Sequence, residues 1–209
     1  MALLHRAELR PSKLDLLAAW LPDRPWFAGT AGADVTRVAT YRFDDPAGEV
    51  GVETLLVRAG EGPVLQVPLT YRGAPLPGAD RWLVGTTEHS VLGPRWVYDG
   101  CADPVYASTL AAAVLAGAGQ AEEYFEVAGG REVRPANMTV TGSHGGVEPP
   151  VVTALPEVVD GDPTLIRAGR LELALVRRPG AAEAPAEARL TGAWPGQESP
   201  LVLAYAAPR

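Results

Sequence analysis

Hydrophobic residues near the start of the chain recur at helical spacing. Ser12 precedes a segment with apolar residues at positions 14, 17, 18 and 21, which share one face of a helix. A serine hydroxyl is a favourable N-cap, and Pro22 cannot continue a helix. The pattern therefore predicts a helix from residue 13 to residue 21.

Three β-rich runs follow this helix, at residues 35–43, 50–59 and 64–71. Segments rich in Asp, Gly and Pro separate them and are typical of turns. Such short connections favour antiparallel pairing of consecutive strands. We predict an antiparallel meander with the first helix packed across it, followed by short strands at residues 81–84 and 95–98.

A second helix is indicated by Asp103 and Pro104, an N-cap residue followed by proline at the first helical position. Gly117 ends it. Beyond this helix the pattern predicts strands at residues 122–127, 138–141, 151–155, 164–167, 170–177 and 201–206, with residues 179–188 as a loop or short helix. The fold class is therefore α+β, mainly antiparallel sheet with two principal helices.

The length of 209 residues suits one large domain or two small ones. Apolar residues make up 47% and charged residues 21%, which is typical of a folded globular chain. The best boundary lies before the second helix and divides the chain into residues 1–98 and 99–209. A single continuous fold is the alternative.

The net charge of −7 excludes a general attraction to nucleic acid or anionic lipid. The N-terminal residues lack the apolar run of a signal peptide, and the longest apolar stretch, residues 110–117, is too short to cross a bilayer. A single cysteine, Cys101, allows no internal disulfide, and we expect its thiol to be buried or inert. We expect a cytoplasmic protein with no nucleic acid or membrane partner.

The basic residues are unevenly divided, because Lys13 is the only lysine among 18 basic side chains and the rest are arginines. A lysine that held phosphate as a point charge would therefore have to be Lys13.

The most polar cluster in a turn-rich region is formed by Glu88, His89, Arg95 and Trp96. A carboxylate, an imidazole and an arginine can bind a sugar or an acid, and turn regions often carry sites. The more favoured interpretation is a loop of hydrogen-bonded surface residues. These four residues are our candidate ligand-binding residues, and we assign no catalytic or metal-ligating residue.

Three other motifs have stronger structural than functional interpretations. Asp160 and Asp162 resemble part of a metal site, but the intervening Gly161 and following Pro163 favour a turn. Residues 143–146, Ser-His-Gly-Gly, are poorly spaced for a catalytic dyad and are expected to form a loop. A sugar-stacking platform is one interpretation of five aromatic residues, but core packing is the default for Trp20, Trp26, Phe27, Trp82 and Trp96.

Residues 17–29, Leu-Ala-Ala-Trp-Leu-Pro-Asp-Arg-Pro-Trp-Phe-Ala-Gly, resemble the opening of the maltokinase N-terminal cap. Residues 65–72 are similar to the third strand of that cap, and residues 96–99 followed by Asp103-Pro104 are similar to the entry of its next helix. The whole chain resembles short, stand-alone actinobacterial proteins of this type more closely than a full kinase. The resemblance implies a cap followed by an arrangement like a kinase N-lobe.

Residues 171–178 resemble the kinase strand that presents a phosphate-binding lysine, but Ala174 stands at that position. A His-Gly-Asp catalytic loop is absent from the sequence, since the three histidines are followed by Arg6, Ser90 and Gly145. The chain ends where a second kinase lobe would be expected, so the base and metal ligands that phosphoryl transfer requires are missing.

We therefore expect a non-catalytic accessory or regulatory module, without a cofactor. Through the resemblance, it would act with a protein partner in trehalose, maltose or glycogen metabolism. The alternative is a protein that binds a sugar or sugar phosphate, and a divergent phosphotransferase is a third candidate. A homodimer formed through an edge strand of the meander stays open.

Overall fold

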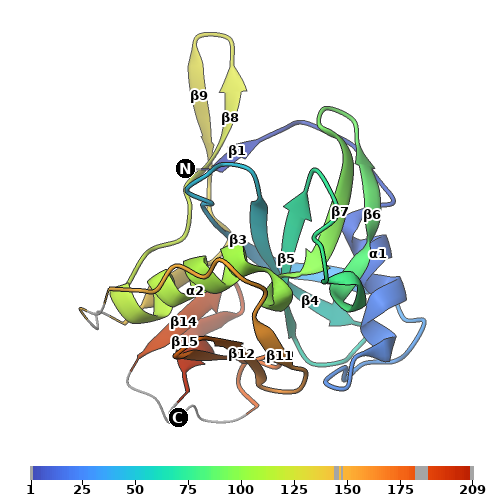
Figure 1. Cartoon of the computed structure of the whole chain (residues 1–209). Coiled ribbons are helices and arrows are strands. Elements are labelled where there is room, and N and C mark those ends of the chain that lie inside the picture. Colours follow the sequence, from blue (N-terminus) through green and yellow to red (C-terminus); the bar gives the residue numbers. More distant parts are fainter. Residues whose placement is uncertain (1, 144–145, 147, 182–187, 208–209) are drawn as a thin grey trace.

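The structure is a computed structural model that describes residues 2–143, 146, 148–181 and 188–207. It contains two six-stranded sheets, one three-stranded sheet and two α-helices (Figure 1). This architecture confirms the predicted α+β class. No helix of the described residues is long and apolar enough to cross a membrane.

The first six-stranded sheet is entirely antiparallel. Its strands lie in the order β2 (Leu9–Arg10), β6 (Leu83–His89), β7 (Gly93–Asp99), β5 (Leu65–Arg72), β4 (Gly51–Ala59) and β3 (Val35–Phe43). The run from β3 to β5 is the predicted meander. The predicted strand at 95–98 lies within β7. Of the predicted strand at 81–84, only residues 83 and 84 belong to β6, because Asp80–Trp82 form a turn of 3-10 helix.

Helix α1 (Lys13–Trp20) packs on one face of this sheet, as predicted. The Ser12 hydroxyl accepts a hydrogen bond from the amide of Asp15, whose carboxylate accepts one from the amide of Ser12. This capping box satisfies two amides at the helix start and fixes where the helix begins.

The two faces of β4 pack against different elements because side chains alternate along a strand. Leu55 and Val57 face the cluster that contains α1, whereas Val52 and Leu56 face the cluster that contains the second helix. Glu53 shares the α1 face with Leu55 and Val57. The first sheet is therefore covered on both sides.

Helix α2 (Pro104–Ala116) begins at the Asp103 cap and ends at Gly117, which is left-handed with φ 70°, as predicted. It passes close to the second sheet at one glycine. A Cβ atom at Gly142 would lie 1.8 Å from the carbonyl oxygen of Ala113, so only glycine permits this approach.

The second six-stranded sheet has the order β10 (Thr139–Gly142), β14 (Arg189–Trp194), β15 (Gln197–Ala206), β13 (Leu171–Leu175), β12 (Thr164–Ala168) and β11 (Glu157–Val159). Strands β11 and β14 were not predicted. The predicted strand at 151–155 is wrong, because this segment runs along α2. There the amide of Val152 donates to the hydroxyl of Ser108, 2.8 Å away, instead of to a neighbouring strand.

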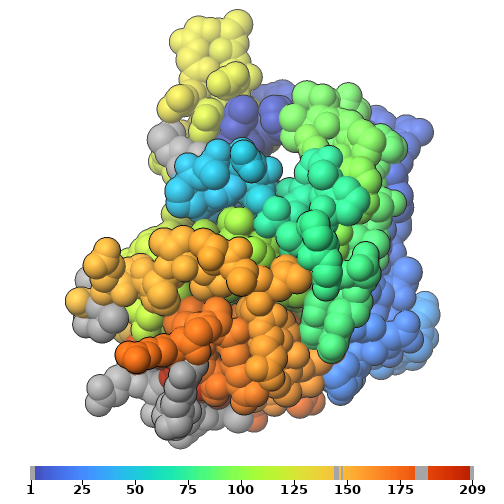
Figure 2. All heavy atoms as spheres, viewed as in Figure 1, coloured from blue at the N-terminus to red at the C-terminus, as the bar shows by residue number. Residues whose placement is uncertain are grey.

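A three-stranded sheet projects from the body of the molecule (Figures 1 and 2). Strand β1 (Ala2–Leu4) pairs in parallel with β8 (Glu123–Val127), which forms a hairpin with β9 (Gly130–Arg134). Only β8 was predicted.

One buried hydrophobic cluster joins β3, β4, α2 and the second sheet. It includes Tyr41 and Leu56 before residue 99 and Leu110, Leu173 and Leu203 after it. The two halves of the chain therefore share a core, and the division into residues 1–98 and 99–209 stays a prediction.

Candidate functional site

The predicted ligand-binding residues lie together on the β6–β7 hairpin, but they divide between its two faces. Opposite residues in an antiparallel pair share a face, and neighbours along a strand alternate. Thr87 pairs with Arg95 and His89 with Gly93, which places His89 and Arg95 on the α1 face. The register places Glu88 and Trp96 on the other face.

Two of the four predicted ligand-binding residues therefore lie on the same face of the hairpin. His89 and Arg95 are half-buried and line a cleft, whereas the lining of that cleft does not include Glu88 or Trp96. Glu88 is exposed beside Pro94 in the hairpin.

The wall of the cleft contains an ion pair between Glu53 of β4 and Lys13, the first residue of α1. Lys13 Nζ donates to Glu53 Oε2 at 2.5 Å, and the Tyr71 hydroxyl donates to the same oxygen at 2.8 Å. Arg42, the cross-strand neighbour of Glu53, lies 3.9 Å from Oε1. The single lysine of the chain is thus held at one geometry by a buried carboxylate.

Two groups of this cluster are fixed in one protonation state. Burial alone would raise the pKa of Glu53, but the charges of Lys13 and Arg42 and the hydrogen bonds from Lys13 and Tyr71 lower it to about 2. Burial, followed by the charge of Glu53, raises the pKa of Tyr71 well above its ordinary value. Glu53 is therefore ionised and Tyr71 neutral throughout the neutral pH range.

The cleft encloses about 600 Å³ and lies on the α1 face of the first sheet, beyond the N-terminal end of α1. Residues 3–9, the β3–β4 turn, the β6–β7 hairpin and β8 contribute to its walls. Figure 2 shows an opening between the dark blue N-terminal segment, the light blue β3–β4 turn and the green β6–β7 hairpin. This volume suits a sugar-sized molecule.

Aromatic and basic side chains line the cleft together with aliphatic residues and four acidic ones. Its aromatic residues are Phe43, Tyr71, Tyr124 and Phe125, and its basic ones include Lys13, Arg37, Arg42, Arg95 and Arg134. Aromatic faces combined with a few convergent polar groups are characteristic of small-molecule sites.

His89 presents a defined tautomer to this cleft. Its Nδ1 accepts hydrogen bonds from the amides of Val91 and Leu92, at 3.2 and 3.1 Å. Partial burial, then the neighbouring charges of His5, Arg95 and Lys13, lower the pKa of His89. The neutral ring therefore carries its proton on Nε2.

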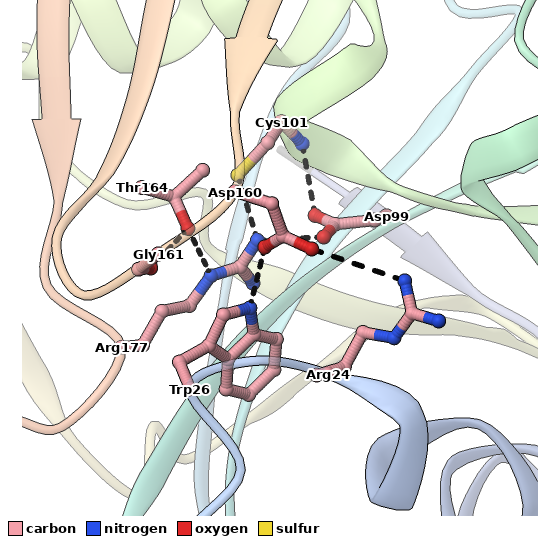
Figure 3. A network of polar contacts seen from close by, with 8 residues as sticks. All are labelled: Arg24, Trp26, Asp99, Cys101, Asp160, Gly161, Thr164 and Arg177. Carbon is pink, nitrogen blue, oxygen red and sulfur yellow. Dashed lines mark hydrogen bonds and ion pairs between the residues drawn. The ribbon is translucent and has the colours of Figure 1, made fainter.

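A second polar cluster surrounds Arg177, which follows β13 and is fully buried (Figure 3). Its guanidinium donates to Asp99 at 2.6 Å, to the Thr164 hydroxyl at 2.8 Å and to Cys101 Sγ at 3.3 Å. It also lies 4.3 Å from the centroid of the Trp26 ring. Trp26 in turn donates to Asp160 at 2.7 Å.

This cluster joins segments that are distant in sequence and is closed to solvent, since the side chains of Arg177 and Asp99 are 0% exposed. Although burial lowers the pKa of Arg177, the charge of Asp99, its hydrogen bond and the other neighbouring groups together outweigh burial and raise it. Burial raises the pKa of Cys101 well above its ordinary value, so the thiol is unreactive, as expected. The arrangement stabilises the fold and offers no access to a ligand.

Asp160 and Asp162 lie in the bend between β11 and β12, and other residues contact both carboxylates. Asp160 accepts the hydrogen bond from Trp26, and Asp162 accepts hydrogen bonds from the amide of Arg177 and the side chain of Arg178. Within the part of the chain that the structure describes, no three His, Cys, Asp or Glu side chains gather as a metal site. Of the predicted loop at 143–146, residues 144 and 145 lie outside the described residues.

Most of the tryptophans occupy the core, as expected. Trp20, Trp26 and Trp82 are buried, and Trp20 packs edge-to-face on Trp26. Ala174 is fully buried in β13 between β12 and β15. A charged side chain at this position would be enclosed by the second sheet.

The sequence analysis singled out Lys13 but missed Glu53 and Tyr71. One signal was available, because Glu53 interrupts a run of apolar strand residues and a buried carboxylate requires a cationic partner. The pairing with Lys13 could not be read from the sequence, since the two residues are 40 positions apart.

Comparison with known proteins gives one family. Residues 20–103 match the maltokinase N-terminal cap domain. Among the curated proteins, none matches the chain at a significant level. The matched segment contains Glu53, Tyr71, His89 and Arg95, whereas Lys13 precedes it.

Proposed function

Because residues 20–103 match the maltokinase N-terminal cap domain, we propose that this chain is a non-catalytic accessory module of maltose or trehalose metabolism that binds a sugar-sized ligand. The ligand occupies the cleft around Lys13, Glu53 and Tyr71. The link to this metabolism rests on the family description. The binding role rests on the geometry of the cleft.

The single observation that carries the proposal is the buried Glu53 carboxylate at the wall of an aromatic-lined cleft. Lys13, Tyr71 and Arg42 hold this carboxylate in place, and the Lys13 side chain is still 25% exposed. A preorganised lysine and tyrosine can hydrogen-bond to sugar hydroxyl groups without reorganising on binding. Tyr71 and Phe125, both half-buried in the cleft lining, supply the apolar surface for a sugar ring.

Binding is favoured over catalysis by the protonation of these groups. A general acid or base works best when its pKa lies near the working pH. Glu53 has a pKa of about 2, and the pKa of Tyr71 is raised far in the opposite direction. Neither group can exchange protons readily near neutral pH, although both can hold a fixed hydrogen-bonding pattern.

A thermal-shift panel of maltose, trehalose, maltose 1-phosphate, glucosamine and ATP tests the proposal. A ligand at 100 times its Kd stabilises the folded state by about 2.7 kcal/mol, which corresponds to a rise in Tm of several degrees. We expect at least one sugar of the panel to raise Tm at millimolar concentration. The absence of any shift would contradict ligand binding in the cleft.

Two tyrosine variants locate the binding site. Tyr71→Phe removes the hydroxyl that contacts Glu53, and we expect it to reduce the ligand-induced shift. Tyr205→Phe is the matched control, because Tyr205 lies in β15 of the second sheet and does not line the cleft. Equal shifts in both variants would place the ligand elsewhere.

A second function, contact with a protein partner, is favoured by the projecting hairpin β8–β9. Strand β9 is an edge of its sheet in the described structure, and Val127 and Val133 are 41% and 50% exposed. Exposed edge strands and apolar side chains are common contact surfaces. We propose that a protein of the same metabolism docks there.

A pull-down from native extract tests this contact. We expect the wild-type chain to retain a glucan-processing enzyme that a Val133→Lys variant releases. Arg58→Gln, an exposed change on β4, is the control. Retention of no such enzyme, or equal retention by Val133→Lys, would contradict docking at β9.

A further inference from the structure

The hairpin side of the cleft carries basic side chains that the fold itself does not neutralise. Among the described residues, the Arg95 guanidinium has one hydrogen bond, to the carbonyl of Pro94 at 3.2 Å, and no carboxylate partner. Lys13, by contrast, is paired with Glu53. Arg95 is half-buried, so its charge faces the cleft with reduced screening by solvent.

Three further basic groups converge on the same place. The rings of His5 and His89 meet edge-to-face with centroids 5.7 Å apart. The charges of His5, Arg95 and Lys13 all contribute to the lowered pKa of His89, after its partial burial. These neighbouring positive charges favour an anion beside His89.

Two acidic side chains of the cleft, those of Asp45 and Glu53, are engaged by other groups of the fold. Asp45 accepts hydrogen bonds from the amides of Ala47, Glu49 and Val50 and thereby shapes the β3–β4 turn. Glu53 is enclosed by Lys13, Tyr71 and Arg42. Asp44 and Glu49 belong to the same β3–β4 turn, across the opening from the hairpin (Figure 2). Of the basic side chains in the cleft lining, His89 and Arg95 belong to the β6–β7 hairpin, whereas Arg37, Arg42 and Arg134 lie on β3 and β9.

We propose that Arg95, His89, His5 and Lys13 form an anion subsite, so that the ligand of the cleft is a sugar bearing a phosphate or carboxylate group. This inference rests on the proposed binding function of the cleft. The anion contacts the Arg95 guanidinium and the Nε2–H of His89, while the sugar ring packs toward Tyr71. Charge-assisted hydrogen bonds give such a subsite its selectivity.

Calorimetric titration of the full chain with three probes tests the subsite: maltose, maltose 1-phosphate and glucuronate. A charge-assisted hydrogen bond corresponds to about a tenfold change in affinity or more. We expect one anionic probe to bind at least about tenfold more tightly than maltose. The anionic probe with the higher affinity shows whether the subsite prefers a phosphate or a carboxylate.

Two arginine variants assign the effect to Arg95. In Arg95→Gln, we expect the preference for the anionic probe to fall to within about threefold of maltose, because the affinity for the anionic probe falls more than the affinity for maltose. Arg58→Gln makes the same charge change on an exposed residue outside the cleft and should keep the wild-type preference. The Tm of each unliganded variant checks that it folds.

NMR titration of the His89 ring gives an independent readout. An anion beside the ring offsets the repulsion from His5, Arg95 and Lys13, so saturation with the anionic probe should raise the pKa of His89. Maltose should leave that pKa unchanged.

The outcomes separate the two proposals. Equal affinity for maltose and both anionic probes, or an equal loss for all probes in Arg95→Gln, would overturn the anion subsite while leaving sugar binding intact. No binding of any probe would overturn both.

Discussion

Two carboxylate–cation pairs in this chain have similar contacts and opposite surroundings. Arg177 and Asp99 are separated by 2.6 Å, and Lys13 and Glu53 by 2.5 Å. The side chains of the first pair are 0% exposed, whereas Lys13 is 25% exposed at the wall of a cleft. The first pair can serve only the fold, but the second can also contact a ligand.

The difference lies in what surrounds each cation. The Arg177 guanidinium is enclosed by Asp99, Thr164, Cys101 and the Trp26 ring, which come from both halves of the chain. Lys13 has its partner on one side and the cleft on the other. Burial of a charged pair is therefore insufficient to identify a binding site. The exposure of the cation to the cleft determines whether a ligand can contact it.

The largest effect is expected from Arg177→Met. This substitution leaves Asp99 buried and without its cation, which in comparable cases costs about 3–5 kcal/mol. The free energy of unfolding in urea measures the loss. A decrease below about 1 kcal/mol would show that Arg177 does not hold the two halves together.

The neighbouring Arg178→Met is the control for this prediction. Arg178 pairs with Asp162 at 2.6 Å, but its side chain is 41% exposed. Exposed pairs contribute about 0–1 kcal/mol, so the variant should unfold close to wild type.

Glu53→Gln should make the free energy of unfolding depend less on pH below pH 4.5. The pKa of Glu53 is lowered from 4.5 to about 2 in the folded protein, so its contribution is complete above pH 4.5 and is lost as the pH falls towards 2. The shift corresponds to about 3 kcal/mol. Urea unfolding at several pH values should show a shallower loss in the variant, and parallel curves would contradict the assignment.

Trp26→Phe should have an intermediate effect on the buried cluster. Phenylalanine retains a ring beneath Arg177 but cannot donate to Asp160, which lies 2.7 Å from the indole nitrogen. Leaving a buried acceptor unsatisfied costs about 1–3 kcal/mol. A variant as stable as wild type would show that Asp160 finds another donor.

Lys13→Met should have the smallest effect on stability. Lys13 is partly exposed, and Glu53 keeps its contacts with Tyr71 and Arg42, so we expect a loss of about 1 kcal/mol. The same variant should lose the ligand-induced rise in Tm. Lys13→Met would then lose ligand binding with little loss of stability, whereas Arg177→Met would lose stability.

Local signals in the sequence were sufficient for much of the fold. The Ser12 cap, the Asp103-Pro104 helix start and the alternation of apolar residues in 35–43 all produced the predicted elements. These features depend on neighbouring residues. Strand β11 was missed because it has only three residues. Strand β14 was missed because one of its two partners, β10, is distant in the sequence.

The candidate site was only partly predictable. His89 and Arg95 were identified from their polar character, but the strand register, which separates them from Glu88 and Trp96, required the β6–β7 pairing. The Lys13–Glu53 pair required knowledge of how α1 lies on the sheet. Long-range packing thus determined which polar residues converge.

The single lysine allows a direct measurement of ligand binding in the cleft. A chain labelled with carbon-13 at the lysine ε carbon gives one side-chain NMR signal, that of Lys13. If the cleft binds a sugar or an anionic sugar, addition of maltose or maltose 1-phosphate shifts this signal in wild type and not in Tyr71→Phe at the same concentration. A signal unchanged at saturating concentrations of both ligands would contradict the account.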